Sequence, residues 1–595
     1  MDVNEQPKHS YDLDLFEYRF LLQHVLGAVG ADQWDSAERL LQSALDFCNS
    51  GFRESGRRAD LEGCSLTADG TVIVPSDFHE WQARFKKTFF DHLSNGEAAT
   101  EMHPSVRYAI LELLMGANAS FMTYFGFNGP SIDLITKYGG FYQDKLMIEK
   151  LRSMDWSSCL CITEDNAGSD LMQIETRGTA QPDGTYLVQG RKRLISAGMH
   201  ELAENIVYFV LVRTGDALGN AGLSCIAIPR YWVDVNGKLS DNNVRCIALP
   251  DKMGFRGCAN TTLEYGGAGP CRGYLMGARE GTGLLQLLTL MVQARVSTGI
   301  YALGTASNAY RSAVTYARNR KQGRSFRQAL NPRAEVIPII EHPDVARMLM
   351  SMKCQIDAAR ALVALLGKLQ ADGANTETGA NPLIALFTPI IKAHLSDQAW
   401  DVCTTAIQVH GGNGYLKDHG IEQAARDVKV LSIWEGTNYI QSQYLLRDAL
   451  GLGLRSKARA LFVEMIRESL SDDKIHPDAV GLRDELQPRL TAWEECLDQI
   501  ARWTRDGQLE EVPKIAVRFQ KLTSQLTFAW LLLRSASAAM SLLRDSNEGL
   551  HGFLRGKIAS AKYYYKEVVP EFDASAIIIM KWVPEVGISA DLFDY

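Results

Sequence analysis

Residues 432–441 read Ser-Ile-Trp-Glu-Gly-Thr-Asn-Tyr-Ile-Gln and contain a single carboxylate, Glu435, among apolar and aromatic neighbours. Desolvation in such surroundings disfavours the charged carboxylate and raises its pKa, which suits a general base. Gly436 follows at once and, having no Cβ, lets another molecule approach the backbone closely. Taken alone, the pattern also fits a carboxylate at the start of a surface helix, which is far commoner than a catalytic one. Its weight therefore depends on the rest of the chain.

The composition is that of an ordinary globular protein. The chain has 595 residues, of which 46% are hydrophobic and 22% charged. At about 100–200 residues per domain, this length predicts about three or four structural units. The formal net charge of -8 argues against a general nucleic-acid-binding protein, which usually has a basic face. A local basic pocket for an anionic ligand remains compatible with this charge.

The sequence also allows predictions about the cellular compartment of the protein and about metal binding. The first twenty residues lack a basic segment followed by an apolar core, so no secretory signal is predicted. No run of 18 apolar residues occurs, so no transmembrane helix is predicted. The eleven cysteines are scattered, without the spacing of a zinc site or a CxxC motif. We therefore expect reduced, mostly buried thiols, a cytoplasmic location and no metal centre.

Periodicity divides the chain into four parts. Residues 1–155 are predicted to be helical, because apolar residues such as Phe16, Phe20 and Val25 recur at helical spacing. Residues 156–280 contain short apolar runs separated by turn signals, which predict an antiparallel β domain. Residues 281–455 are again helical, and a further helical domain is predicted over residues 456–595. Loops are expected at 371–382 and 469–478. The predicted fold class is α+β, mostly α.

Two segments at the predicted β domain are candidate ligand-binding elements. Residues 161–170, CITEDNAGSD, follow the first strand and can present backbone N–H groups and hydroxyls to a polar ring or a phosphate. A plain β-turn explains the same residues. Residues 190–198, GRKRLISAG, are also consistent with a strand that has a charged edge.

Two further segments follow long helical runs. Residues 318–324, RNRKQGR, are either a solvated helix end or an anion clamp, since arginine matches phosphate geometry. Residues 408–415, QVHGGNGY, are either a helix C-cap with its loop or a backbone that approaches a nucleotide closely. His410 has no other ligand-type residues beside it, which favours a structural role for it over a role as a ligand. The sequence shows no Walker loop and no GxGxxG after a strand.

In this order and at these separations, the segments resemble the acyl-CoA dehydrogenase flavoprotein family. CITEDNAGSD is similar to its first signature, and QVHGGNGY with ARDVKVLSIWEGTNYIQ is similar to its C-terminal signature. The resemblance covers roughly residues 60–450. The length and the EGTN form are most similar to the long branch that includes 3-methylmercaptopropionyl-CoA dehydrogenase. It implies a helical domain, a β domain, a four-helix-bundle domain and an extra helical extension.

The resemblance implies FAD as cofactor and an acyl-CoA substrate. Glu435 would be the base that removes the α-proton, and the β-hydride would pass to the flavin. The thioester oxygen would be held by the backbone N–H of Glu435 and a ribityl hydroxyl of FAD. The implied cofactor residues are Leu160, Ile162, Thr163, Gly168, Ser169, Leu194, Ser196, Arg320, Gln322, Gln408, Gly411, Gly412, Thr437 and Tyr439. The implied substrate residues are Ser169, Arg295, Gly436 and Arg447.

In this family, residues such as Arg320, Gln322, Gln408, Gly411 and Gly412 contact the FAD of a neighbouring subunit. The resemblance therefore implies a homodimer or homotetramer. It also implies an electron-transfer flavoprotein as acceptor, and no nucleic-acid or membrane partner.

Several residues depart from the family pattern. Asp165 stands in place of a proline, Leu194 in place of an aromatic residue, and Tyr439 in place of Glu or Gln. Residues 89–102 lack the loop expected to cap the acyl pocket. These departures leave three alternatives open. One is a specialised member that acts on an unusual acyl-CoA or an acyl-carrier-protein thioester. The others are a DNA-associated stress-response relative, disfavoured by the acidic charge, and a non-catalytic scaffold, disfavoured by Glu435.

Overall fold

The computed structural model describes residues 15–93, 102–234, 236–374, 381–471, 474–546, 548–582 and 593. The region between Phe89 and Met102, where the capping loop is missing from the sequence, lies mostly outside these residues. So does most of the tail after Trp582.

The N-terminal part is helical. Its aromatic side chains pack in one core, where Phe52 lies edge to face with Phe121 and tilted against Phe47. The sequence analysis missed a small hairpin of β1 (Ser65–Leu66) and β2 (Val72–Ile73) in this part. The helices are α1 (Phe16–Arg19), α2 (Ala31–Phe47), α3 (Arg53–Glu62), α4 (Phe78–Leu93), α6 (Pro104–Ala117), α7 (Ala119–Met122), α8 (Asn128–Tyr138) and α9 (Asp144–Arg152).

An eight-stranded sheet forms the middle part, in the order β10-β11-β5-β12-β7-β6-β3, with β4 beside β5 and β6. Most strands are antiparallel, as predicted, but β3 pairs with β6 in parallel. The strands are β3 (Trp156–Cys161), β4 (Arg177–Ala180), β5 (Tyr186–Ser196), β6 (Asn205–Arg213), β7 (Leu223–Pro229), β10 (Val244–Ala248), β11 (Asn260–Tyr265) and β12 (Arg272–Leu275). A separate hairpin consists of β8 (Tyr231–Val233) and β9 (Leu239–Asp241).

The position of strand β6 between two hydrophobic cores explains why its sequence is almost continuously apolar. Tyr208 and Val210 belong to the main core, whereas Val207 and Phe209 belong to a second core on the other face of the sheet. Both faces of β6 are therefore covered, and neither set of side chains needs to be polar.

Long helices form the third part, and α10 and α12 pack closely. Gly299 makes this approach possible, because a Cβ there would lie 2.3 Å from Cγ2 of Ile391 on α12. The N-terminus of α12 is capped by Asn381, whose side chain accepts from Leu383 N–H, and Pro382 follows the cap. The helices are α10 (Gly283–Asn319), α11 (Pro343–Ala374), α12 (Pro382–His410), α13 (Ile421–Lys429) and α14 (Asn438–Gln443).

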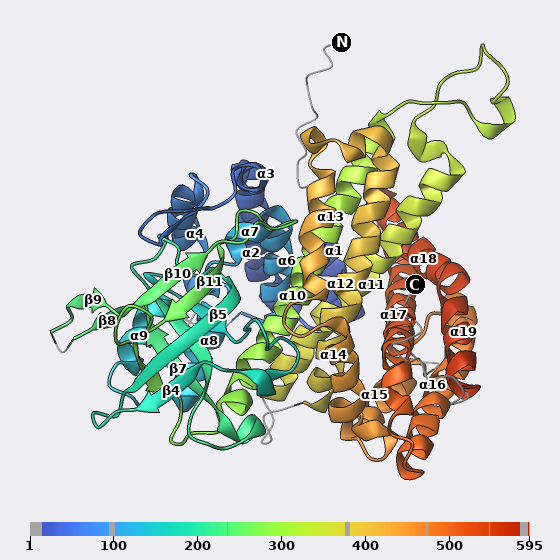
Figure 1. The fold of residues 1–595 in the computed structure, drawn as a ribbon. Helices are drawn as coiled ribbons and strands as arrows, with labels where there is room; N and C mark the ends of the chain where they lie inside the picture. The colour runs from blue at the N-terminus through green and yellow to red at the C-terminus, as the bar shows by residue number, and fades with distance from the viewer. Residues whose placement is uncertain are drawn as a thin grey trace.

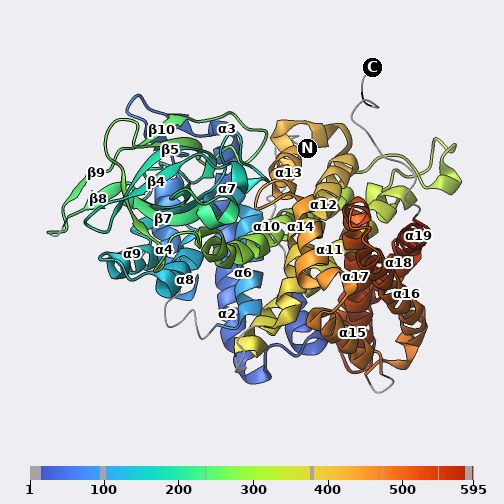
Figure 2. The same cartoon turned by 60° about the horizontal axis from the view of Figure 1, so that its bottom comes forward.

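The C-terminal helices lie on the side of this bundle opposite the β domain (Figures 1 and 2). Helix α17 packs against α11, α12 and α14, directly behind the helix that follows Glu435. These helices are α15 (Lys457–Ser469), α16 (Val480–Arg505), α17 (Glu511–Asp545), α18 (Glu548–Glu567) and α19 (Val569–Met580). The predicted fold class, with its order of helices, strands and helices, is confirmed.

One helix qualifies the prediction about membrane spans. Residues Glu511–Arg544 are long and apolar enough to cross a membrane by length and composition, although 72% of the most apolar window is buried inside the fold. Polar residues interrupt this helix, so a search for unbroken apolar runs misses it. Its burial is the arrangement of a core helix.

Candidate active site

Glu435 lies in a tight turn between the short 3-10 helix Val430–Ser432 and α14. Thr437 caps α14, and the side-chain amide of Gln441 donates to the carbonyl oxygens of Glu435 (3.0 Å) and Gly436 (3.4 Å). Glu435 has a φ of 55°, a left-handed conformation that is uncommon for residues other than glycine. Such strain persists only where the surrounding structure imposes it, and it gathers at functional sites.

The electrostatic surroundings of Glu435 are those expected of a base. Burial raises its pKa to about 7, while Arg295 and Lys392 act in the opposite direction. A carboxyl with a pKa near 7 combines an accessible ionised form with useful basicity.

Arg295 of α10, which was named from the sequence, interacts electrostatically with Glu435. It is 4% exposed, and its guanidinium lies 5.2 Å from the ring centre of Tyr444. Its Nε and Nη1 atoms have no hydrogen-bond partner among the described residues. Arg447, also named from the sequence, is exposed and pairs with Asp448 at 2.8 Å. The two arginines therefore lie in different environments near the same short helix, Tyr444–Ala449.

Lys392 of α12 was missed by the sequence analysis. It is fully buried, and its Nζ donates to the Asn438 side chain at 2.8 Å, three residues after Glu435. Burial lowers its pKa to about 7, against the influence of Asp397 and Glu435. The signal in the sequence was a lone lysine within an apolar helical run, Pro389-Ile390-Ile391-Lys392-Ala393.

The β domain supplies a second wall. Leu160, Ile162 and Thr163 are half-buried at the end of β3, and Arg193 N–H donates to the Thr163 carbonyl at 2.9 Å. Leu194 next to it is 51% exposed and has a φ of 59°. Ser196 is half-buried at the end of β5.

Two contacts connect this part of the β domain with the turn that contains Glu435. The ring of Trp434 lies 5.4 Å from that of Phe255, in the loop before β11. Asn260, the first residue of β11, pairs with Ser196 of β5. The structure therefore relates the turn of Glu435 to the wall that carries Leu194 and Ser196.

The segment GRKRLISAG does not form a charged strand edge throughout. Lys192 is fully buried and forms an ion pair of 2.6 Å with Glu164 of the CITEDNAGSD segment. Glu164 also accepts from the N–H groups of Glu175 and Thr176. The pair anchors the turn that presents Gly168 and Ser169, which are both exposed. The segment is part of strand β5, as the strand interpretation expects, but Lys192 points to the buried carboxylate of Glu164 instead of to solvent.

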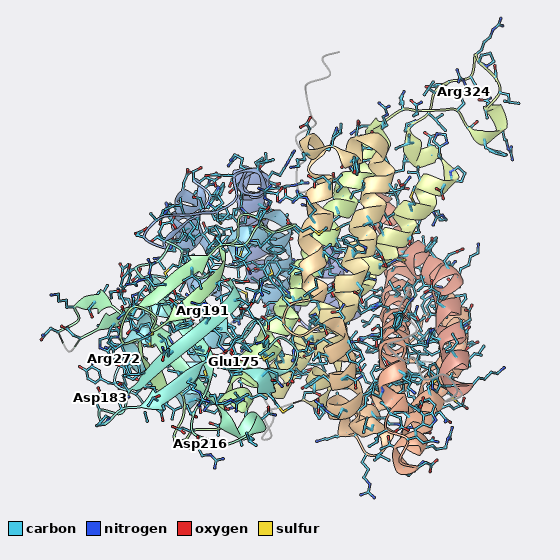
Figure 3. All side chains as sticks on the ribbon, viewed as in Figure 1. Glu175, Asp183, Arg191, Asp216, Arg272 and Arg324 are labelled. Carbon is cyan, nitrogen blue, oxygen red and sulfur yellow. The ribbon has the colours of Figure 1, made fainter. Side chains whose placement is uncertain are left out.

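A second group of predicted cofactor residues lies elsewhere. Arg320, Gln322, Gln408, Gly411 and Gly412 are all exposed. Stacking of Tyr316 on His410, with ring centres 4.5 Å apart, holds the end of α10 beside the end of α12. Arg320 and Gln322 follow the end of α10, where the chain leads into the arm that carries Arg324 and projects from the body (Figure 3).

This second group of residues lies far from the turn that contains Glu435. Lys392 and His410 both lie on α12, and a rise of about 1.5 Å per residue separates them by about 27 Å.

The site next to Glu435 has the features of a binding site for a large, partly apolar ligand. Ile433 and Tyr439, neighbours of Glu435 in the sequence, present exposed apolar surface, with Tyr439 46% exposed, and Leu194 of the β domain is also exposed. Polar atoms of Arg295, Trp434 and Asn260 are buried without a hydrogen-bond partner among the described residues. Apolar walls with a few unsatisfied polar groups are typical of cofactor sites.

A cavity of about 340 Å³ lies between the N-terminal helices and α10. Its apolar walls include Leu111, Met115, Met122 and Phe125, and Gln293, Val296 and Ser297 line it from α10. Arg295, within the same stretch of α10, interacts with Glu435. Within the described part of the chain, no group of three or more His, Cys, Asp or Glu residues could hold a metal ion. All eleven cysteines are free thiols, and ten are buried.

Comparisons with known proteins show the family of this chain. Family models described as the middle and C-terminal domains of acyl-CoA dehydrogenase match residues 159–267 and 281–450. A model described as acetyl-CoA dehydrogenase C-terminal like matches residues 462–582. The 3-methylmercaptopropionyl-CoA dehydrogenase of Ruegeria pomeroyi is 31% identical over 558 residues, which cover 91% of each chain. The chain belongs to the acyl-CoA dehydrogenase family.

Other relatives extend this result. The broad-specificity linear acyl-CoA dehydrogenase FadE5 of Mycobacterium tuberculosis is 30% identical over 534 residues, 86% of each chain. Caenorhabditis elegans ACDH-11, solved in complex with C11-CoA, has the same fold, with a TM-score of 0.74 at 18% identity over 97% of this chain and 96% of that one. The Bacillus anthracis acyl-CoA dehydrogenase, solved with FAD, has a TM-score of 0.65 at 18% identity over 97% and 90%. This protein is therefore an oxidoreductase that dehydrogenates acyl-CoA, and its C-terminal extension is part of the shared fold.

Proposed function

We propose that this acyl-CoA dehydrogenase uses FAD to oxidise a saturated acyl-CoA to its trans-2-enoyl thioester, with Glu435 as the base. The raised pKa of Glu435, beside two buried cations, is the observation that carries the proposal. FAD, when bound, accepts the β-hydride, so that the substrate loses a proton and a hydride in total.

Glu435 takes the proton from the α-carbon. Negative charge then develops towards the thioester oxygen, and positive groups nearby stabilise this charge because they lie in a site of low dielectric constant. The unpartnered N–H groups of Arg295 provide such a field. Gly436 has a φ of 82°, and a Cβ there would lie 3.0 Å from Nε2 of Gln441, so glycine suits this turn beside the proposed base. The apolar cavity beside α10 suits the hydrocarbon part of the acyl group.

FAD would be held by residues from two subunits. Leu160, Ile162, Thr163, Gly168, Ser169, Leu194, Ser196, Thr437 and Tyr439 would bind the part near the base. A second group consists of Arg320, Gln322, Gln408, Gly411 and Gly412. It lies near His410, which is about 27 Å from Lys392 along α12, and this distance supports the proposal that the group binds the FAD of a neighbouring subunit. A homodimer or homotetramer follows from that sharing. An electron-transfer flavoprotein is the proposed acceptor.

Anaerobic titration of the purified flavoprotein with a panel of acyl-CoAs tests the proposal. We expect the flavin absorbance to bleach in the wild type. Glu435→Gln should keep FAD and bleach at least a thousandfold more slowly, because the amide cannot accept the α-proton; about this loss is expected when a positioned base is removed. Glu149→Gln is the matched control, since Glu149 is exposed on α9. Normal bleaching of Glu435→Gln, or none in the wild type with any thioester, would contradict the proposal.

A further inference from the structure

The buried amine of Lys392 lies next to the turn of residues 435–438, called the base turn below. Lys392 has no exposed surface, and it comes from the middle of α12 rather than from the segment that carries Glu435. A buried lysine is costly unless its charge is compensated and its hydrogen bonds are made. The mechanism proposed above gives it no role.

Lys392 reaches the base turn through one residue. Its Nζ donates to Oδ1 of Asn438 at 2.8 Å, and Nδ2 of Asn438 donates to Asp397 at 2.7 Å and to Ser396 at 3.0 Å. Asn438 is the first residue of α14, so this network joins the end of the base turn to α12. It opposes the relaxation of the left-handed backbone at Glu435.

The charges around Lys392 come from three elements. Asp397 of α12 and Glu435 of the base turn favour its ionised form, and Arg295 of α10 disfavours it. Glu435 in turn interacts with Arg295 and Lys392, and Asp397 with Lys429, Lys392 and Asp401. From α17, behind these elements, Lys521 acts on His394 and Asp401. Lys392 is thus the cation that links Asp397 to Glu435.

We infer that Lys392 is a positioning residue for the base: through Asn438 it holds the turn of residues 435–438 against α12, and through its charge it favours the proton-accepting form of Glu435. The inference rests on the proposed function, in which Glu435 is the base. Because Lys392 and Glu435 interact closely, the protonation step that limits activity at low pH belongs to the pair rather than to either group.

The test is the pH profile of single-turnover flavin bleaching by an acyl-CoA that reduces the wild type. The wild-type rate should rise with pH through about 7, because Glu435 must lose its proton first. Lys392→Met removes a positive charge, so Glu435 should hold its proton to higher pH. The acid limb should move up by about one pH unit, so that the rate is about fivefold lower near pH 7, about tenfold lower well below pH 7, and recovers at higher pH.

Two further variants complete the test. Lys392→Arg keeps a positive charge and should leave the acid limb within a few tenths of a unit of the wild type or below it. Lys521→Met, an exposed lysine of α17 paired with Glu571 at 2.9 Å, is the matched control and should change neither limb nor rate. If Lys392→Met does not retain FAD, Lys392→Gln takes its place, since it is uncharged yet polar.

An acid limb that stays in place in the uncharged variant would overturn the inference, and so would an equal loss of rate at every pH. Failure of the proposed function would be seen separately. In that case Glu435→Gln itself would bleach, whatever the variants of Lys392 do.

Discussion

At Lys192, a positive charge lies fully buried beneath the turn of residues 165–170. Burial alone would raise the pKa of its partner Glu164, but Lys192 and the hydrogen bonds from Thr176 and Glu175 hold that pKa below its ordinary value. The ion pair and the two backbone hydrogen bonds fix the start of the turn that carries Gly168 and Ser169. A single buried pair therefore shapes one wall of the flavin site.

We predict that Lys192→Met destabilises the protein by about 3–5 kcal/mol, since removing one partner leaves a buried carboxylate uncompensated. Urea denaturation followed by circular dichroism measures this loss, and the FAD content should fall with it. Arg191→Met is the neighbouring control, because Arg191 is exposed and its pair with Glu264 lies at the surface. Exposed pairs contribute about 0–1 kcal/mol. Equal effects of the two variants would contradict this account.

At the scale of elements, α10 is the helix on which the site is built. Arg295 interacts electrostatically with Glu435, the proposed base, and four residues later Gly299 lies against α12. A Cβ on Gly299 would lie 2.6 Å from the carbonyl oxygen of Ile391, the residue before Lys392. The close approach of the two helices therefore sets the distance between the two cations that face Glu435.

Gly299→Ala should push α10 and α12 apart. We expect a loss of stability of about 1–3 kcal/mol from overpacking, together with slower flavin bleaching. Gly552→Ala on α18 is the matched control, because nothing lies within 4 Å of a Cβ built there. That change should be neutral or stabilise by up to about 1 kcal/mol, since alanine is the better helix former. Thermal unfolding of both variants decides whether close packing, rather than the substitution itself, matters.

For the whole molecule, a buried network of charged side chains connects α18 of the C-terminal extension with α1 of the N-terminal part. Lys557 of α18 contacts Asp357 of α11 at 2.8 Å and Glu17 of α1 at 2.5 Å. Arg360, one turn further along α11, contacts Glu112 of α6 at 2.7 Å. The C-terminal extension is thereby tied to the N-terminal helices and to the bundle that carries the active site. It supports the bundle rather than forming a separate appendage.

Lys557→Met should destabilise the protein by about 3–5 kcal/mol at neutral pH. Burial opposes ionisation of Asp357 and Glu17, but the surrounding lysines and Arg360 hold both pKa values below their ordinary range. The stability that they contribute is present above about pH 4 and is lost as the pH falls through the folded-state pKa values. The variant should therefore lose less stability on acidification than the wild type. Denaturation midpoints between pH 7 and pH 3 measure this, with Lys562→Met, exposed on the same helix, as control.

From the sequence alone, the order of helices, strands and helices was predictable, and Glu435 was recognisable as a candidate base. Helical and strand periodicities are local, so the four-part organisation followed from residues that are neighbours in the chain. Glu435 was recognisable because its apolar neighbours and Gly436 are adjacent to it, and the CITEDNAGSD and QVHGGNGY segments are equally local. The family resemblance rested on these segments and is confirmed by the comparisons.

Only the tertiary structure decided which distant residues act on the local ones. Lys392 lies 43 positions before Glu435, and Lys192 lies 28 positions after Glu164, so no local pattern pairs them. It also placed Arg295 in the buried site and Arg447 at the surface, although both are arginines near the same short helix. Partners of this kind are set by helix packing and strand pairing, and these depend on the shape of the whole core rather than on neighbouring residues.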